Sequence, residues 1–168
     1  MAESTVVKIP KDGTITITDG TTPTAKSYTV AYEDGNFSSS QPKRERLVIR
    51  DRGTIVNVRE TNEQTGTISF SVHMRNFTSE NDATLVDVVE FTESWVDAVS
   101  TGGVGFEGEW VACAFSANAG TGAGEDQAHG LTFPKVIFDW EFSEGDPNVI
   151  NFTGMTVGRP TRSGPVAS

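Results

Sequence analysis

Alternation of apolar and polar residues runs through most of this chain and predicts a series of β-strands. The clearest case spans residues 66–75 and puts four apolar side chains on one face, namely Ile68, Phe70, Val72 and Met74. The opposite face of the same segment carries Thr67, Ser69, Ser71 and His73. Because successive side chains of a strand point to opposite faces, we expect one face to be buried and the other to meet water.

Seven further segments show strand-like patterns bounded by turn residues, and they are 14–18, 26–33, 43–50, 54–60, 109–116, 131–142 and 149–157. In segment 43–50 we expect Leu47 and Ile49 to face inward, and Arg52-Gly53 to turn the chain into the next strand. Segment 109–116 has a second face of small side chains, made by Ala112, Ala114 and Ser116. We expect mobile loops at 34–42 and 116–130, which are polar or rich in glycine, and a loose tail at 158–168.

One segment has helical spacing instead. Residues 82–99 place apolar side chains on one side of a 3.6-residue period, and these are Leu85, Val88, Val89, Trp95, Val96 and Val99. Acidic side chains occupy the other side, and no Lys or Arg occurs between Asn76 and Phe133 to pair with them. We therefore expect packing of the apolar face on a sheet to hold this helix in place.

Together these patterns predict a single, mainly β domain over residues 1–168. We expect an antiparallel β-sandwich or half-barrel of about eight strands, flanked by one α-helix. A chain of 168 residues is long enough to bury a real core. Its one cysteine, Cys113, cannot form an internal disulfide, and we expect it to be a buried small apolar residue. The first residues lack an apolar signal-peptide core, so we expect a soluble, unexported protein.

Charge is distributed unevenly along the chain, whose formal net charge is −10. Residues 43–75 hold 7 basic and 4 acidic groups, whereas residues 76–158 hold 1 basic and 14 acidic groups. The acidic total argues against a dedicated nucleic-acid binder, which needs a dense basic face. A solvated surface would explain this asymmetry, and so would copies that attract one another head to tail.

Residues that carry chemistry are few. The chain has no Gly-x-Ser-x-Gly elbow and no phosphate-binding Gly-x-x-x-x-Gly-Lys loop, so nothing favours an enzyme or a cofactor. Glu125, Asp126 and His129 lie close together on a glycine-rich stretch that is not a preorganised metal site, and whether they bind an ion stays open. We expect His73 to be a polar outward residue of its strand.

Three tryptophans, Trp95, Trp110 and Trp140, suggest a sugar-stacking platform of the kind found in carbohydrate-binding sandwiches. Trp95 falls on the apolar helix face and Trp140 on an aromatic strand face, so core positions fit both better.

The order of several short motifs resembles the tail tube, or major tail, proteins of long-tailed bacteriophages, a family that is also similar to the tube subunit of type VI secretion. The motifs are Asp12-Gly13-Thr14-Ile15, Tyr28-Thr29-Val30, Glu33-Asp34-Gly35-Asn36-Phe37, Asp51-Arg52-Gly53 and Gly66-Thr67-Ile68-Ser69-Phe70-Ser71 before a single helix. The resemblance implies a non-enzymatic virion protein, made in the host cytoplasm, that forms six-copy rings stacked into a tube. It also implies a channel that DNA crosses during genome ejection, contacts with baseplate or tip, terminator and tape-measure proteins, and no membrane contact.

Within such a tube, faces with small side chains suit a wet inner wall. We therefore expect Thr67, Ser69, Ser71, Ala112, Ala114 and Ser116 to line the channel. We expect the ring-stacking contacts to involve Asp34, Gly35, Asn36, Phe37, Arg44 and Arg46, with the basic segment of one copy meeting the acidic segment of the next. The alternative is a monomeric β-sandwich binding module, either a carbohydrate-binding or a virion decoration domain.

Overall fold

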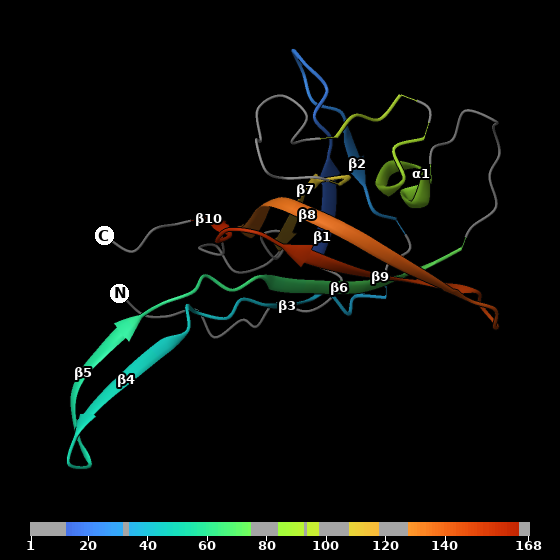
Figure 1. Cartoon of the computed structure of the whole chain (residues 1–168). Coiled ribbons are helices and arrows are strands. Elements are labelled where there is room, and N and C mark those ends of the chain that lie inside the picture. Colours follow the sequence, from blue (N-terminus) through green and yellow to red (C-terminus); the bar gives the residue numbers. More distant parts are fainter. Residues whose placement is uncertain are drawn as a thin grey trace, which may run out of the picture.

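The computed structural model describes residues 13–31, 34–74, 84–92, 94–97, 108–117 and 128–164. Ten strands and one short helix occur in these residues (Figure 1). The strands are β1 (Gly13–Thr18), β2 (Ser27–Thr29), β3 (Ser38–Ser40), β4 (Arg46–Asp51), β5 (Thr54–Glu60), β6 (Gly66–His73), β7 (Val111–Ala117), β8 (His129–Ser143), β9 (Val149–Thr156) and β10 (Thr161–Ser163). The helix is α1 (Leu85–Val89).

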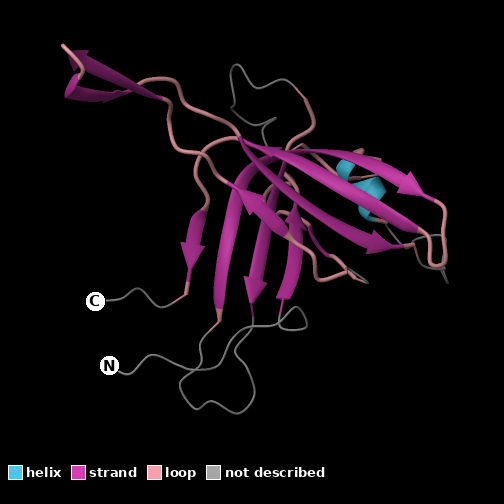
Figure 2. Ribbon diagram, turned by 90° about the horizontal axis from the view of Figure 1, so that it is seen from below, coloured by secondary structure: helices cyan, strands magenta, loops and turns pink. Residues whose placement is uncertain are grey.

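Eight of the strands form one antiparallel sheet in the order β2-β1-β7-β8-β9-β6-β3, with β10 also paired to β8. The 15-residue strand β8 joins the two parts of this sheet. Its first half pairs with β7, for example at Phe115↔Leu131, and its second half pairs with β9, for example at Trp140↔Phe152. The sheet coils around its core (Figure 2), so the expected mainly β, antiparallel architecture is confirmed.

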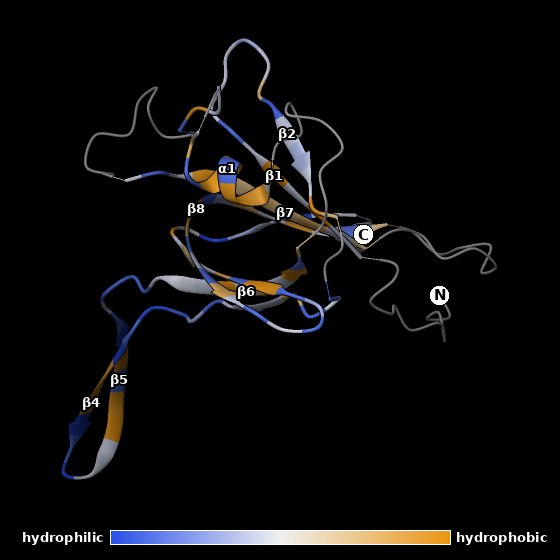
Figure 3. Ribbon diagram, turned by 90° about the vertical axis from the view of Figure 1, so that its right-hand side faces the viewer, coloured by the Kyte–Doolittle hydropathy of each residue, from blue (hydrophilic) through white to orange (hydrophobic). Residues whose placement is uncertain are grey.

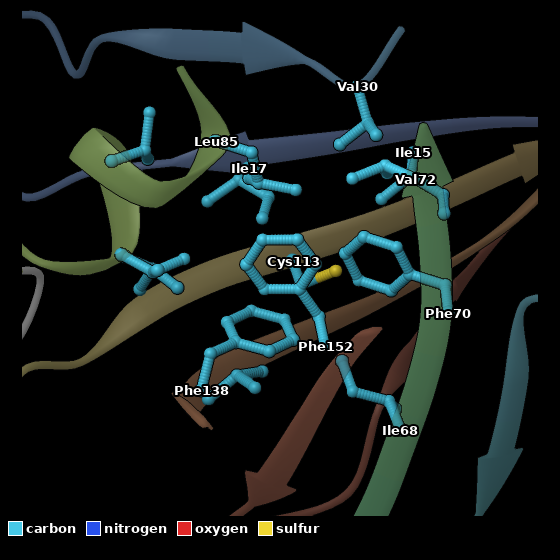
Figure 4. Close-up of a cluster of buried hydrophobic side chains, with 14 of the residues drawn as sticks. Ile15, Ile17, Val30, Ile68, Phe70, Val72, Leu85, Cys113, Phe138 and Phe152 are labelled. Carbon is cyan, nitrogen blue, oxygen red and sulfur yellow. The ribbon is translucent and has the colours of Figure 1, made fainter. Parts of the chain in front are cut away.

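The core lies inside this coil and draws on both parts of the sheet. Ile15, Ile17 and Cys113 come from β1 and β7, and they meet Ile68, Phe70, Phe138 and Phe152 from β6, β8 and β9 (Figure 4). The alternation predicted for 66–75 holds at Ile68, Phe70 and Val72, which are buried, but Met74 lies beyond the end of β6 and is 52% exposed, so its expected inward position is wrong. Burying a side chain of this size contributes about 1.5–3 kcal/mol.

The segment after β2 crosses from one edge of the sheet to the other. The N–H of Val30 donates to the carbonyl of Ile15 in β1, and the N–H of Asp34 donates to the carbonyl of Ser71 in β6. Phe37 then packs against the core, and Ser38–Ser40 form β3 at the edge of β6. The expected loop at 34–42 therefore contains strand β3 and a core contact at Phe37.

Two other irregular stretches are shorter than the sequence predicts. Strand β7 continues to Ala117 and β8 begins at His129, so Ser116 and Gly130 are strand residues. Residues 118–127 lie outside the described part of the chain. In the expected loose tail, Thr161–Ser163 form β10 because they pair with residues 130–132 of β8.

The helix is much shorter than the predicted 82–99. Thr84 caps α1 by accepting a hydrogen bond from the N–H of Asp87, whose carboxylate accepts from the N–H of Thr84 in return. Glu90 ends the helix, and Phe91 has a φ of 52°, which an α-helix does not allow. Leu85, Val88 and Val89 are buried as predicted. Trp95 lies beyond the helix, and Val99 lies outside the described residues.

Candidate assembly surfaces

A polar face runs across four neighbouring strands on the outer side of the sheet. Strand pairing sets Ser38 beside Ser69, Ser69 beside Thr153 and Thr153 beside Asp139. Ser38 and Ser69 share a hydrogen bond of 3.2 Å between their hydroxyl oxygens. We call the outward residues of these strands the β6 face, and it includes Thr67, Ser69, Ser71, Asn151, Thr153 and Asp139.

Side chains on the β6 face hold one another in place. The hydroxyl of Ser71 donates to Asn151 Oδ1 at 2.7 Å and accepts from Asn36 Nδ2 at 3.1 Å. The N–H of Ser71 also donates to Asn36 Oδ1 at 2.9 Å. These bonds order a wall of small hydroxyl and amide groups that water can wet.

The second predicted set, Ala112, Ala114 and Ser116, lies elsewhere on the sheet. In β7, Ala114 pairs with Thr16 of β1 and Thr132 of β8, so this outer face is also small and polar. The inward neighbours of the two sets, Phe70 and Cys113, meet in one core (Figure 4). The outward side chains of β6 and β7 therefore point away from each other. A single straight channel would be lined by only one of the two predicted sets.

The β4–β5 hairpin extends away from the rest of the sheet (Figure 1). All residues of both strands are exposed, including six large apolar residues: Leu47, Val48, Ile49, Ile55, Val56 and Val58. Leu47 is 54% exposed and Ile49 is 37% exposed, so the expected inward position of both residues is wrong within one chain. The predicted turn is confirmed, since Arg52 and Gly53 both have positive φ, at 46° and 87°.

Apolar side chains leave this hairpin on both faces. Val48 lies directly opposite Val58, while Leu47 and its partner Arg59 project from the other side. Figure 3 shows hydrophobic stretches in both β4 and β5. A lone two-stranded hairpin is marginally stable in water at best. The hairpin thus carries apolar surface that a contact with another molecule would bury.

An apolar cavity of about 460 Å³ opens beside α1, at the far end of β6. Its walls include Val30, Leu85, Met74, Trp140, Phe142 and Ile150. Trp140 and Phe142 are 42% and 46% exposed, so the expected core position of Trp140 is wrong. The Trp140 indole N–H donates to Glu90 Oε1 at 2.7 Å, which fixes the ring at the rim.

His73 lines this cavity, and acidic side chains lie near it. His73 Nε2 is 2.5 Å from Asp34 Oδ1, so His73 is held by an acidic partner instead of simply facing water. No basic residue occurs between Lys135 and Arg159, whereas Glu144 and Asp146 are exposed in the turn that follows Phe142, and Glu90 contacts Trp140. The described charges on the β8–β9 side of the cavity are therefore acidic.

The residues expected to stack rings have different positions in the chain. Asp34, Asn36 and Phe37 make internal contacts, with His73, Ser71 and Phe115 respectively. Gly35 has a φ of 68° in the same crossing segment. Arg44 and Arg46 are exposed at the base of the hairpin, and contact of any of these residues with another copy stays a prediction.

Reactive and ligating groups do not gather into a catalytic or metal centre among the described residues. Cys113 is buried, and burial raises the pKa of its thiol to about 12. No described group of three His, Cys, Asp or Glu side chains is placed to hold a metal ion. Whether Glu125, Asp126 and His129 bind an ion stays open, because Glu125 and Asp126 lie outside the described part of the chain. The tryptophans do not form a platform either, because Trp110 is buried and Trp95 packs edge-on to Tyr28.

The sequence contains a pattern that indicates apolar side chains on both faces of the hairpin, although the search for alternating strands misses it. Leu47, Val48 and Ile49 are consecutive, as are Ile55 and Val56, so apolar side chains must leave both faces of the hairpin. Nothing comparable marks Trp140 and Phe142, whose exposure depends on where their neighbours end.

Comparison with known proteins supports the fold. No protein-family model matches the chain, and no curated protein matches it. A similar fold over nearly the whole chain occurs in a chain of the cryo-EM structure of the anti-feeding prophage (AFP) baseplate, 6-fold symmetrised. The two chains share 12% identity with a TM-score of 0.52, and the match covers 98% of each. Among the described residues, no helix has the length and apolar character needed to cross a membrane.

Proposed function

We propose that this protein is a structural subunit of a phage tail or a related injection apparatus, and specifically a tube subunit. Six copies would form a ring, and stacked rings would enclose a channel. The observation that carries the proposal is the projecting β4–β5 hairpin, whose six exposed apolar side chains have a use only in contact with another molecule. The fold shared with a chain of a six-fold symmetric baseplate supports it.

In this proposal the β6 face lines the channel. Its hydroxyl and amide groups meet water well, and Asp139 and Glu141 give the wall the negative sign that keeps a passing nucleic acid from adhering. The small residues of β7 would then lie away from the channel. DNA is a transient passenger in this account, and the stable partners are further copies and other tail proteins of the virion.

A structural role fits the chemistry of the chain better than an enzymatic one. His73 is paired with Asp34, and the Cys113 thiol is sealed in the core. The competing function is a monomeric binding module, and the apolar cavity beside α1 is the observation in its favour.

Light scattering coupled to size-exclusion chromatography separates the two functions. A tube subunit should elute as ring or tube species whose mass grows with concentration. A binding module should keep the mass of one 18.0 kDa chain at all concentrations, and that result would overturn the tube proposal.

A further inference from the structure

We infer that the apolar cavity beside α1 is the socket for the β4–β5 hairpin of a second copy of this chain. This inference deepens the proposed function, since it names the two surfaces that join successive copies. The hairpin presents exposed apolar side chains, and the described residues around the cavity enclose an open apolar space of about 460 Å³. Such a volume has room for several aliphatic side chains.

The position of the two surfaces requires a second copy. The hairpin precedes the Gly66 end of β6, whereas His73 and Met74 at the other end line the cavity. With a rise of about 3.3 Å per residue, the eight residues of β6 separate these ends by roughly 23 Å. Figure 1 shows the hairpin and α1 on opposite sides of the molecule. A contact between two different surfaces is heterologous, so each copy can hold the next and the assembly can grow.

Charge favours the same pairing. The hairpin holds four basic and two acidic residues, namely Arg46, Arg50, Arg52 and Arg59 against Asp51 and Glu60. Near the cavity, Glu90 contacts Trp140 at the rim, Glu144 and Asp146 lie in the turn that follows Phe142, and no basic residue occurs between Lys135 and Arg159. Opposite charges steer two such surfaces together and fix their register, while the apolar contact supplies most of the affinity.

The test is complementation between two variants. The first, Val48→Asp with Val58→Asp, replaces apolar side chains of the hairpin by charged ones and leaves the cavity intact. The second, Phe142→Lys, removes an aromatic side chain from the cavity and adds a positive charge that repels the basic hairpin of another copy. Its own hairpin is unchanged. All four of the sites involved in the test, including the control site Val96, are exposed, so the fold should survive, and circular dichroism with thermal melting checks this.

Each variant alone should associate at least tenfold more weakly than wild type, since each loses one apolar half of the contact. An equimolar mixture should form a species of twice the mass of either variant alone, because one intact hairpin then meets one intact socket. Val96→Lys is the matched control, because Val96 is similarly exposed but lies outside the hairpin, the cavity and the β6 face, and it should associate as wild type does.

A mixture that fails to double its mass, or a variant that associates as wild type does, would overturn the inference. The proposed function is judged separately by electron microscopy of the wild type. Tubes without complementation would leave the function standing with a different contact, and complementation without rings would leave the contact standing with a different assembly.

Discussion

Phe37 stacks on Phe115 with ring centroids 4.8 Å apart and planes 9° from parallel. The contact joins the segment that crosses from β2 to β3 with strand β7, and Phe37 also meets Phe70 of β6 at 6.3 Å. Phe37 thus fixes the crossing segment over the core, in a stretch that looks polar and loop-like in the sequence.

Replacing Phe37 by alanine should lower the free energy of unfolding by about 3 kcal/mol, because the core loses an aromatic side chain and gains a cavity. Urea unfolding followed by fluorescence measures this. The matched control is Phe142→Ala in the monomer, which should cost far less because Phe142 is half exposed. Equal losses for the two variants would show that Phe37 does not support the core.

Asp19 ties distant parts of the chain together. Its carboxylate accepts hydrogen bonds from the N–H groups of Thr21, Lys26 and Val96 at 3.1, 2.7 and 3.2 Å. Burial raises the pKa of this carboxyl, but the hydrogen bonds from Thr21, Lys26 and Val96 outweigh burial and hold the pKa below its ordinary value. Asp19→Ala should destabilise the fold by about 1–3 kcal/mol at pH 7, because donors are left unpaired.

The effect of Asp19 should depend on pH in a defined direction. Since its pKa is lower in the folded state, the carboxylate stabilises the fold above the unfolded-state value of about 3.9. That stabilisation is lost as the pH falls through the folded-state pKa. The difference in unfolding free energy between wild type and Asp19→Asn should therefore shrink between pH 5 and pH 2, and a difference that is constant or grows would contradict the account.

Much of the fold follows from local pattern, because strands such as β1 and β6 alternate strictly and have one buried face. The helix could not be delimited in this way, since its apolar period continues to Trp95. Residues 94–97 are held instead by tertiary contacts, in which Lys26 donates to the carbonyl of Ser94 at 2.6 Å and lies 5.7 Å from the Trp95 ring. Similarly, Ser38–Ser40 have no strand pattern and become β3 only because β6 offers an edge.

The candidate surfaces were predictable only in part. The small polar face of β6 is visible in the sequence because it belongs to one strand. The hydrogen bonds that link Asn36, Ser71 and Asn151 are not visible in the sequence, because they depend on the pairing of three distant segments. The cavity likewise depends on β2, α1, β8 and β9 meeting at the end of β6.

A cysteine in place of Ser69 should report on the channel. Because Cys113 is buried and its thiol pKa is raised to about 12, the added cysteine should be the main reactive thiol at neutral pH. A bulky maleimide should label Ser69→Cys slowly in assembled protein and at least tenfold faster when Val48→Asp and Val58→Asp block assembly. Equal rates in the two backgrounds would exclude the β6 face from the channel.

Reversing two charges at the base of the hairpin should slow assembly. Arg44→Glu with Arg46→Glu replaces attraction to an acidic surface by repulsion, and each exposed pair contributes only about 0–1 kcal/mol. Assembly should be slow at low salt and recover partly when salt screens charges over about 10 Å at 0.1 M. Wild-type speed at both salt concentrations would place these arginines away from the contact between copies.

The central claim is that copies of this chain assemble into stacked rings around a channel lined by the β6 face. Cryo-electron microscopy of concentrated wild-type protein tests it most directly. The account predicts stacks of six-copy rings, with Ser69 and Thr153 facing the channel and the β4–β5 hairpin buried between copies. Monomers at all concentrations, or assemblies without a central channel, would contradict it.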